Sequence, residues 1–74
     1  MWYLYICNRN GQLYTGITTD LNNRMRQHNN AELLYIEGFQ SKKDVAKRER
    51  EIKGWRRDKK LELIHSKNKP VSLP

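Results

Sequence analysis

The sequence predicts an α+β fold, a single domain with the element order ββαβαα. Two short runs rich in aromatic and β-branched residues flank an Asn-Gly pair, a third such run lies near the middle, and helix-capping residues precede the segments between and after them. At 74 residues the chain can bury only about 60% of its unfolded surface, which allows one small core. We expect this domain to span residues 1–64 and a flexible tail to span residues 65–74.

The first two runs predict a β-hairpin. WYLYIC and QLYTGI give strands over residues 2–7 and 12–17, and Asn10-Gly11 between them is a strong signal for a tight turn. This turn would pair Arg9 with Gln12, Cys7 with Tyr14, and Tyr5 with Gly16. Side chains alternate along a strand, so one sheet face is expected to carry Tyr3, Tyr5, Tyr14 and Gly16, and the other Trp2, Leu4, Ile6 and Leu13.

Capping residues place the helices. Thr18-Thr19-Asp20 predicts the start of a helix that ends near His28, before Asn29-Asn30. The run ELLYIEGF predicts a third strand over residues 32–37. Ser41, with Asp44 three residues later, predicts a second helix that runs to Lys53.

Gly54 is expected to end this second helix. A third helix is expected over residues 57–64, with Leu61 and Ile64 facing inward.

The charge pattern points to a polyanionic partner. The net charge is +7 and the pI near 9.9, and ten of the nineteen residues from 42 to 60 are Lys or Arg. A one-sided basic surface of this kind favours nucleic acid, either DNA or RNA, over a merely well-solvated surface. The oligomeric state is left open by the sequence.

The remaining composition excludes several other classes. The single Cys7 allows neither an internal disulfide nor a thiolate metal site, which favours a reducing compartment, and we expect the cytoplasm. The chain has no apolar run of about 18 residues and no signal peptide at its N-terminus, so no membrane association is expected.

Charged residues fall on helix sides that should face the sheet. Counted at helical spacing from Leu21, the first helix places Arg24 and His28 beside Met25 on its inward side. The alternative interpretation is that Arg24 extends past Met25 to solvent and that His28 is an ordinary edge histidine.

The second helix shows the same feature. Val45 and Ile52 mark its apolar side, Glu49 projects between them, and Glu51 points away. Buried charges must be paired or bind something, so an inward Arg24, His28 and Glu49 beside a tyrosine face suggest a site for chemistry.

These residue types fit phosphodiester hydrolysis. One carboxylate without a histidine or cysteine partner suits Mg²⁺ or Mn²⁺, because a hard ion keeps its waters and accepts a substrate phosphate as a ligand. Arginine matches phosphate in bidentate geometry and can stabilise charge that develops on phosphorus. Tyrosine is a poor base at its free pKa near 10, and a neighbouring cation or metal-bound water can lower that pKa.

The same residues resemble a known family. Tyr3-Leu4-Tyr5 and Tyr14-Thr15-Gly16, followed by Arg24 and then His28-Asn29, with Glu49 later in a helix, resemble the GIY-YIG nuclease superfamily. The segments WYLYI, LYTGITTDL, RMRQHN and AKREREIK are similar to those of its small stand-alone bacterial members. The resemblance covers about residues 2–64.

The resemblance implies a three-stranded antiparallel sheet flanked by helices, and a DNA endonuclease that uses one divalent ion, Mg²⁺ or Mn²⁺. It implies that Tyr14 deprotonates or orients the attacking water and that Tyr5 assists by hydrogen bonding. Arg24 would stabilise the transition state and Glu49 would hold the metal. His28 would lie beside the scissile phosphate.

The resemblance also implies that Gly16 leaves space where the backbone nears the site. The chain departs from the family in two places. Only residues 29–31 separate the first helix from the third strand, where relatives usually have a longer segment, so part of the substrate surface or the activity itself would be lost. The late asparagine of some branches has no clear counterpart, since Asn68 lies in the expected tail.

Two functions follow from these observations. The first is a metal-dependent DNA endonuclease whose selectivity is low or based on DNA structure, as in repair, because the chain has no additional domain for target choice. The alternative is a non-catalytic nucleic-acid-binding module that retains the fold. In both, phosphate contacts are expected from Lys42, Lys43, Lys47, Arg48, Arg50, Lys53, Arg56 and Arg57. A protein-interaction role would rest on Trp55 and Tyr35 alone, which are more typical of a core.

Overall fold

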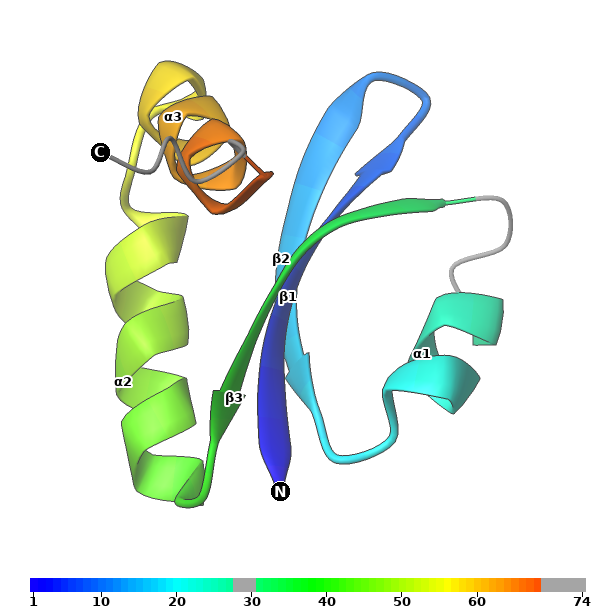
Figure 1. The fold of residues 1–74 in the computed structure, drawn as a ribbon, viewed down its shortest axis with the longest axis vertical. Coiled ribbons are helices and arrows are strands. Elements are labelled where there is room, and N and C mark those ends of the chain that lie inside the picture. The colour runs from blue at the N-terminus through cyan, green and yellow to red at the C-terminus, as the bar shows by residue number, and fades with distance from the viewer. Residues whose placement is uncertain (28–30, 69–74) are drawn as a thin grey trace, which may run out of the picture.

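The six predicted elements are present in the predicted order (Figure 1). The structure is a computed structural model, and it describes residues 1–27 and 31–68. The elements are β1 (Trp2–Arg9), β2 (Gln12–Thr18), α1 (Leu21–Gln27), β3 (Glu32–Phe39), α2 (Lys42–Lys53) and α3 (Arg57–Asn68). The α+β prediction is therefore confirmed.

The three strands form one antiparallel sheet in the order β2-β1-β3. The predicted hairpin register is confirmed, with Cys7 opposite Tyr14 and Tyr5 opposite Gly16. Asn10 and Gly11 have φ angles of 54° and 84°. A two-residue turn with both φ angles positive matches the twist of the strands, which is why an Asn-Gly pair fixes this register.

The pairing of β1 with β3 contains an irregularity that the sequence did not predict. Ile6 lies opposite Tyr35, but the register shifts after Ile6, so that Cys7 lies opposite Leu33. Strand β3 also continues to Phe39, two residues beyond the predicted end. The extension pairs Phe39 with Trp2 and lengthens the sheet next to the start of α2.

Helices lie on both sides of the sheet. In Figure 1, α2 and α3 lie on one side and α1 on the other. The apolar core forms between the sheet and the pair α2 and α3, from Leu4, Ile6, Tyr35, Val45, Ile52 and Ile64. By contrast, none of the residues of α1 is buried.

Side-chain caps start the first two helices as predicted. Asp20 Oδ1 accepts a hydrogen bond from the Asn23 amide at 3.2 Å, and Ser41 Oγ accepts from the Lys43 and Asp44 amides. Gly54 is the C-cap of α2, but its φ of −80° is right-handed. The conformational freedom of glycine is therefore not what ends this helix.

The C-terminal prediction is wrong in part. Helix α3 continues through residues 65–68, which the sequence assigned to a flexible tail, whereas residues 69–74 of that tail lie outside the described residues. Leu61 and Ile64 face inward as predicted, with Ile64 in the core and Leu61 packed against it. None of the described helices is long and apolar enough to cross a membrane.

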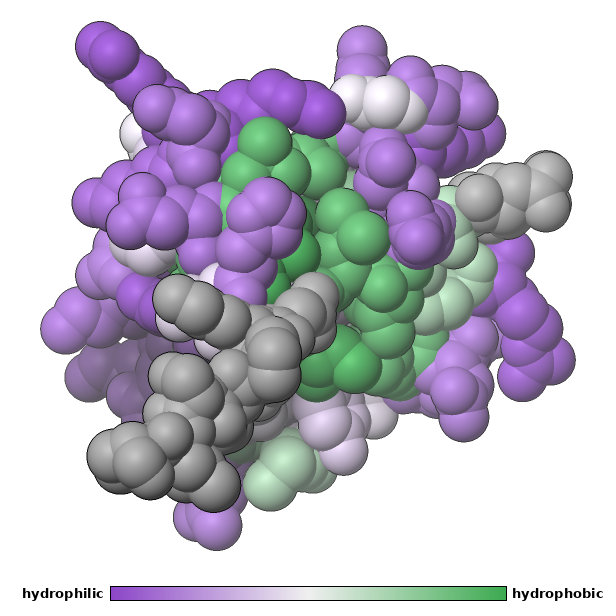
Figure 2. Space-filling view, turned by 45° about the horizontal axis from the view of Figure 1, so that its top comes forward, coloured by the Kyte–Doolittle hydropathy of each residue, from purple (hydrophilic) through white to green (hydrophobic). Residues whose placement is uncertain are grey.

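The surface is mostly hydrophilic. In Figure 2 polar side chains surround one continuous apolar area on the face in view. Among the described residues the large hydrophobic side chains with substantial exposure are Met1, Tyr14 and Leu33. Of these, Tyr14 is the side chain that the sequence predicted to be catalytic.

Candidate active site

The packing of Tyr5 on Gly16 organises the hairpin face that α1 overlies. Tyr5 is 4% exposed and lies opposite Gly16 across the β1–β2 pair. A Cβ atom at Gly16 would lie 2.5 Å from Tyr5 Oη and 2.7 Å from Tyr5 Cζ. Glycine at this position thus allows the tyrosine ring to lie across the neighbouring strand.

The Tyr5 hydroxyl is affected by charges from both helical layers. Burial raises its pKa, the charge of Arg24 on α1 lowers it, and Cys7 and Glu49 raise it further. The net effect is a pKa above the usual value of 10.0, so the hydroxyl is protonated at neutral pH. Tyr5 is therefore suited to donate a hydrogen bond and not to act as a base.

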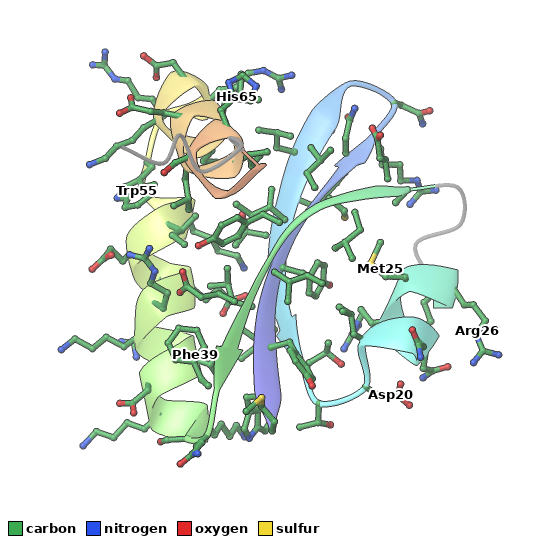
Figure 3. All side chains as sticks on the ribbon, in the orientation of Figure 1. Asp20, Met25, Arg26, Phe39, Trp55 and His65 are labelled. Atoms are coloured by element: carbon green, nitrogen blue, oxygen red, sulfur yellow. The ribbon has the colours of Figure 1, made fainter. Side chains whose placement is uncertain are left out.

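Arg24 is exposed, so the prediction that it lies on a buried side of the first helix is wrong. The reason is that α1 is only seven residues long and buries none of them. Figure 3 shows Met25 directed toward the sheet and Arg26 directed away from it. Arg24 is nevertheless close enough to Tyr5 to lower its pKa. His28 lies outside the described residues.

Glu49 is the inward glutamate of α2, as predicted. Its side chain is 20% exposed, against 52% for Glu51. The adjacent Arg48 reaches Glu37 in β3, with 3.0 Å between Nε and Oε1. Successive helical residues are rotated by about 100°, so Glu49 points in a different direction from Arg48 and away from β3. This direction is consistent with the charge of Glu49 raising the pKa of Tyr5, which lies in the central strand β1.

Tyr14 lies on the sheet edge formed by β2 and is 41% exposed. Its hydroxyl donates a hydrogen bond to Gln12 Oε1 at 3.1 Å. Residues two apart in a strand share a face, so Gln12 belongs to the same surface. The sequence interpretation did not include Gln12, although the period of two could have identified it.

Comparisons with known proteins identify the family of this chain. The profile of the GIY-YIG catalytic domain matches residues 1–32, which contain β1, β2 and α1. A UPF0213 protein of Staphylococcus saprophyticus is 40% identical over 75 residues, covering 84% of this chain and 92% of the relative. The chain belongs to the UPF0213 family of GIY-YIG domain proteins.

Other members of the family support the fold. A UPF0213 protein of Staphylococcus epidermidis is 39% identical over 74 residues, covering 84% of this chain and 89% of the relative. The solution structure of a UPF0213 protein from Bacillus halodurans superposes with a TM-score of 0.69 at 29% identity and covers 100% of both chains. The fold of this chain is therefore that of its family.

The alignment with the Staphylococcus saprophyticus relative also contains a length difference. It extends over 75 residues, although 84% of this 74-residue chain is only about 62 residues. The relative thus has roughly a dozen additional residues within the aligned region. This agrees with the short segment seen in the sequence after His28.

The described residues contain no group of three or more His, Cys, Asp or Glu side chains able to hold a metal ion. Glu49 can contribute one carboxylate, which lies 3.3 Å from the Lys53 ammonium. Such a donor set fits a hard divalent ion only if waters and a substrate phosphate complete its shell. Mg²⁺ and Mn²⁺ meet this condition.

The eight predicted phosphate-binding residues divide into two groups. Arg48 is part of an internal network, because it pairs with Glu37 and Glu51 and lies 5.4 Å from the ring centroid of Trp55. Its guanidinium therefore already has partners within the protein, whereas the sequence analysis expected it to contact phosphate. The other seven residues are exposed: Lys42, Lys43, Lys47, Arg50, Lys53, Arg56 and Arg57.

Some of the exposed cations also contact the protein. Lys42 Nζ lies 5.6 Å from the ring centroid of Trp2, and Arg57 Nη1 donates to the Gly11 carbonyl at 3.0 Å. Lys43, Lys47 and Arg50 line a shallow surface pocket together with Glu51. The basic surface therefore extends along α2 to the start of α3.

The network around Arg48 is the feature that sequence reasoning missed. Tyr35 donates a short hydrogen bond to Glu37, whose other oxygen accepts from Arg48. Burial, followed by the hydrogen bond to Glu37, raises the pKa of Tyr35 to about 12. Burial lowers the pKa of Arg48, but its bonds to Glu37 and Glu51 outweigh this and raise it overall. The network ties α2 to β3.

Proposed function

We propose that this chain is a divalent-metal-dependent endonuclease that hydrolyses phosphodiester bonds in DNA. The observation that carries the proposal is the setting of the Tyr5 hydroxyl. Arg24 from α1 and Glu49 from α2, which have opposite charges and come from opposite sides of the sheet, both act on it. A cationic group for phosphate and a carboxylate for a metal near one hydroxyl are the parts that this reaction needs.

The proposed mechanism assigns one task to each residue. Tyr14, exposed on β2, orients or deprotonates the attacking water, and its contact with Gln12 directs the hydroxyl. Tyr5, kept protonated by its raised pKa, donates a hydrogen bond at the site. Arg24 stabilises the charge that develops on phosphorus.

Glu49 would hold the divalent ion, and His28 would lie beside the scissile phosphate. A bound Mg²⁺ or Mn²⁺ would act as a Lewis acid and stabilise the leaving oxygen. Gly16 fixes the geometry of Tyr5, because any side chain there would displace the ring. The exposed cations of α2 and α3 would position the DNA through phosphate contacts, without reading its sequence. Selectivity for DNA structure, as in repair, is part of the proposal.

A specific observation favours a second function. The chain lacks roughly a dozen residues that its Staphylococcus saprophyticus relative has in the aligned region. If these residues complete the substrate surface, the protein is a nucleic-acid-binding module without useful cleavage. Its affinity would then depend steeply on salt and little on base sequence.

Cleavage assays on supercoiled, branched and single-stranded DNA with Mg²⁺ or Mn²⁺ distinguish the two functions. In a nuclease, Tyr14→Phe and Glu49→Ala should lose cleavage and retain DNA binding. Glu51→Ala is the matched control, because it removes the more exposed carboxylate two positions away on the same helix. Salt-sensitive binding by the unaltered protein without cleavage of any substrate would contradict the nuclease proposal.

A further inference from the structure

The Glu49 carboxylate is paired within α2. Lys53 Nζ lies 3.3 Å from Glu49 Oε2, one helical turn further along the chain. The Glu49 side chain is 20% exposed and that of Lys53 is 57% exposed. A glutamate four residues before a lysine is the favoured orientation for such a pair, so the two side chains meet without strain.

Other cations of α2 are placed differently. Arg48 pairs with Glu37 and Glu51, on the side of α2 that faces β3. Lys47 precedes Glu49 by two residues, which places it about 200° around the helix. Of the described residues, Lys53 is the cation that forms an ion pair with Glu49.

This pair conflicts with metal binding at the same carboxylate. An ammonium within 3.3 Å of Glu49 Oε2 would repel a divalent ion on that carboxylate. The Lys53 ammonium is on a flexible four-carbon stem and is more than half exposed, so it can move away at low cost. Once displaced, it remains within reach of any phosphate that completes the shell of the ion.

We propose that Lys53 is a positioning residue that holds Glu49 until a divalent ion displaces it, and that its freed ammonium then contacts a nucleic-acid phosphate beside the ion. This inference rests on the proposed function, because it takes Glu49 as the metal ligand. Binding of the metal and binding of the nucleic acid would then favour each other, because both require the Lys53–Glu49 ion pair to open and the ligand that binds first opens it.

The direct test measures metal affinity without nucleic acid. Free Mn²⁺ would be titrated with the full chain and followed by electron paramagnetic resonance. Lys53→Gln should tighten Mn²⁺ binding about three- to tenfold, because it removes a positive charge next to the site. Lys47→Gln, which removes the same charge from another side of the helix, should change it by less than about twofold. Lys53→Arg, which retains the charge, should resemble the unaltered protein.

A second readout follows the displaced ammonium. With a labelled duplex in Ca²⁺, Lys53→Gln should weaken binding and lower the slope of log affinity against log salt by about 1. In EDTA, where Lys53 stays on Glu49, the same substitution should have a smaller effect. Lys47→Gln should act equally in both conditions.

The outcomes separate the two proposals. If Glu49→Gln abolishes Mn²⁺ binding but Lys53→Gln and Lys47→Gln bind Mn²⁺ equally, the role of Lys53 is refuted and the metal-ligand role of Glu49 stands. If Glu49→Gln binds Mn²⁺ as the unaltered protein does, both proposals are refuted.

Discussion

On the side of the sheet that packs against α2 and α3, Leu4 and Ile6 are fully buried, whereas α1 on the other side contains no buried residue. The first side is closed by apolar contacts and by the network from Tyr35 through Glu37 to Arg48. The second side leaves Arg24 and Tyr14 exposed next to a buried Tyr5. In a chain this small, one side of the sheet provides most of the stability, and the other leaves polar side chains exposed.

The largest effect expected from this difference is on stability. Leu4→Ala should lower the free energy of unfolding by about 2 to 5 kcal/mol, because it leaves a cavity in the core. Met25→Ala, in α1, should lower the free energy of unfolding by less than about 1 kcal/mol, because no residue of this helix is buried. Urea denaturation followed by circular dichroism measures both. Similar losses from the two substitutions would mean that α1 is packed as tightly as α2.

A smaller loss is expected at Gly16. Gly16→Ala places a Cβ 2.5 Å from Tyr5 Oη and should cost about 1 to 3 kcal/mol. Gly54→Ala is the matched control, because its Cβ would meet nothing closer than 3.5 Å and its φ of −80° suits any residue. The control should be neutral or slightly stabilising. Equal melting temperatures for the two variants would argue against the close packing of Tyr5 on Gly16.

The buried network predicts a specific alkaline instability. The pKa of Tyr35 is about 12 in the folded protein and near 10 when unfolded, so the unfolded chain releases this proton first as pH rises. The contribution of Tyr35 to the free energy of unfolding is therefore fully present below about pH 10. It is lost as the pH rises from about 10 to about 12, which lowers the free energy of unfolding by about 1 to 2 kcal/mol.

Tyr35→Phe should remove this part of the pH dependence. It should also lose about 1 kcal/mol at neutral pH with the hydrogen bond to Glu37. Unfolding curves of both proteins at pH 8 and pH 11.5 provide the measurement. If the free energy of unfolding falls equally in the two proteins between these two pH values, Tyr35 is not the source of the alkaline instability.

The parts of the structure that local rules determine were predictable from the sequence. The Asn10-Gly11 turn and the period of two fixed the register of β1 and β2, and Ser41 fixed the start of α2. The end of α3 was missed because helical propensity simply continues beyond Ile64, with no glycine or proline before Asn68. The register shift after Ile6 depends on how β3 meets β1, which no local pattern encodes.

For the candidate site residues, local rules predicted the orientation of some side chains but not of others. The helix-face argument distinguished Glu49 from Glu51 correctly, because Val45 and Ile52 are both buried and define the inward side. It failed for Arg24, because periodicity shows which side of α1 faces the sheet but not how closely the helix approaches it. The ion pair of Arg48 was missed because its partner Glu37 is eleven residues away, in another element.

The most direct test of the account compares two arginines of α1. Arg24 and Arg26 are both exposed, but Arg24 influences Tyr5 while Arg26 points away from the sheet (Figure 3). Neither Arg24→Gln nor Arg26→Gln should change stability by more than about 0.5 kcal/mol. Single-turnover cleavage of supercoiled DNA with Mn²⁺ should fall about 100-fold or more for Arg24→Gln and by less than about twofold for Arg26→Gln. Equal rates for the two variants would contradict the claim that Arg24, the arginine that acts on Tyr5, stabilises the transition state.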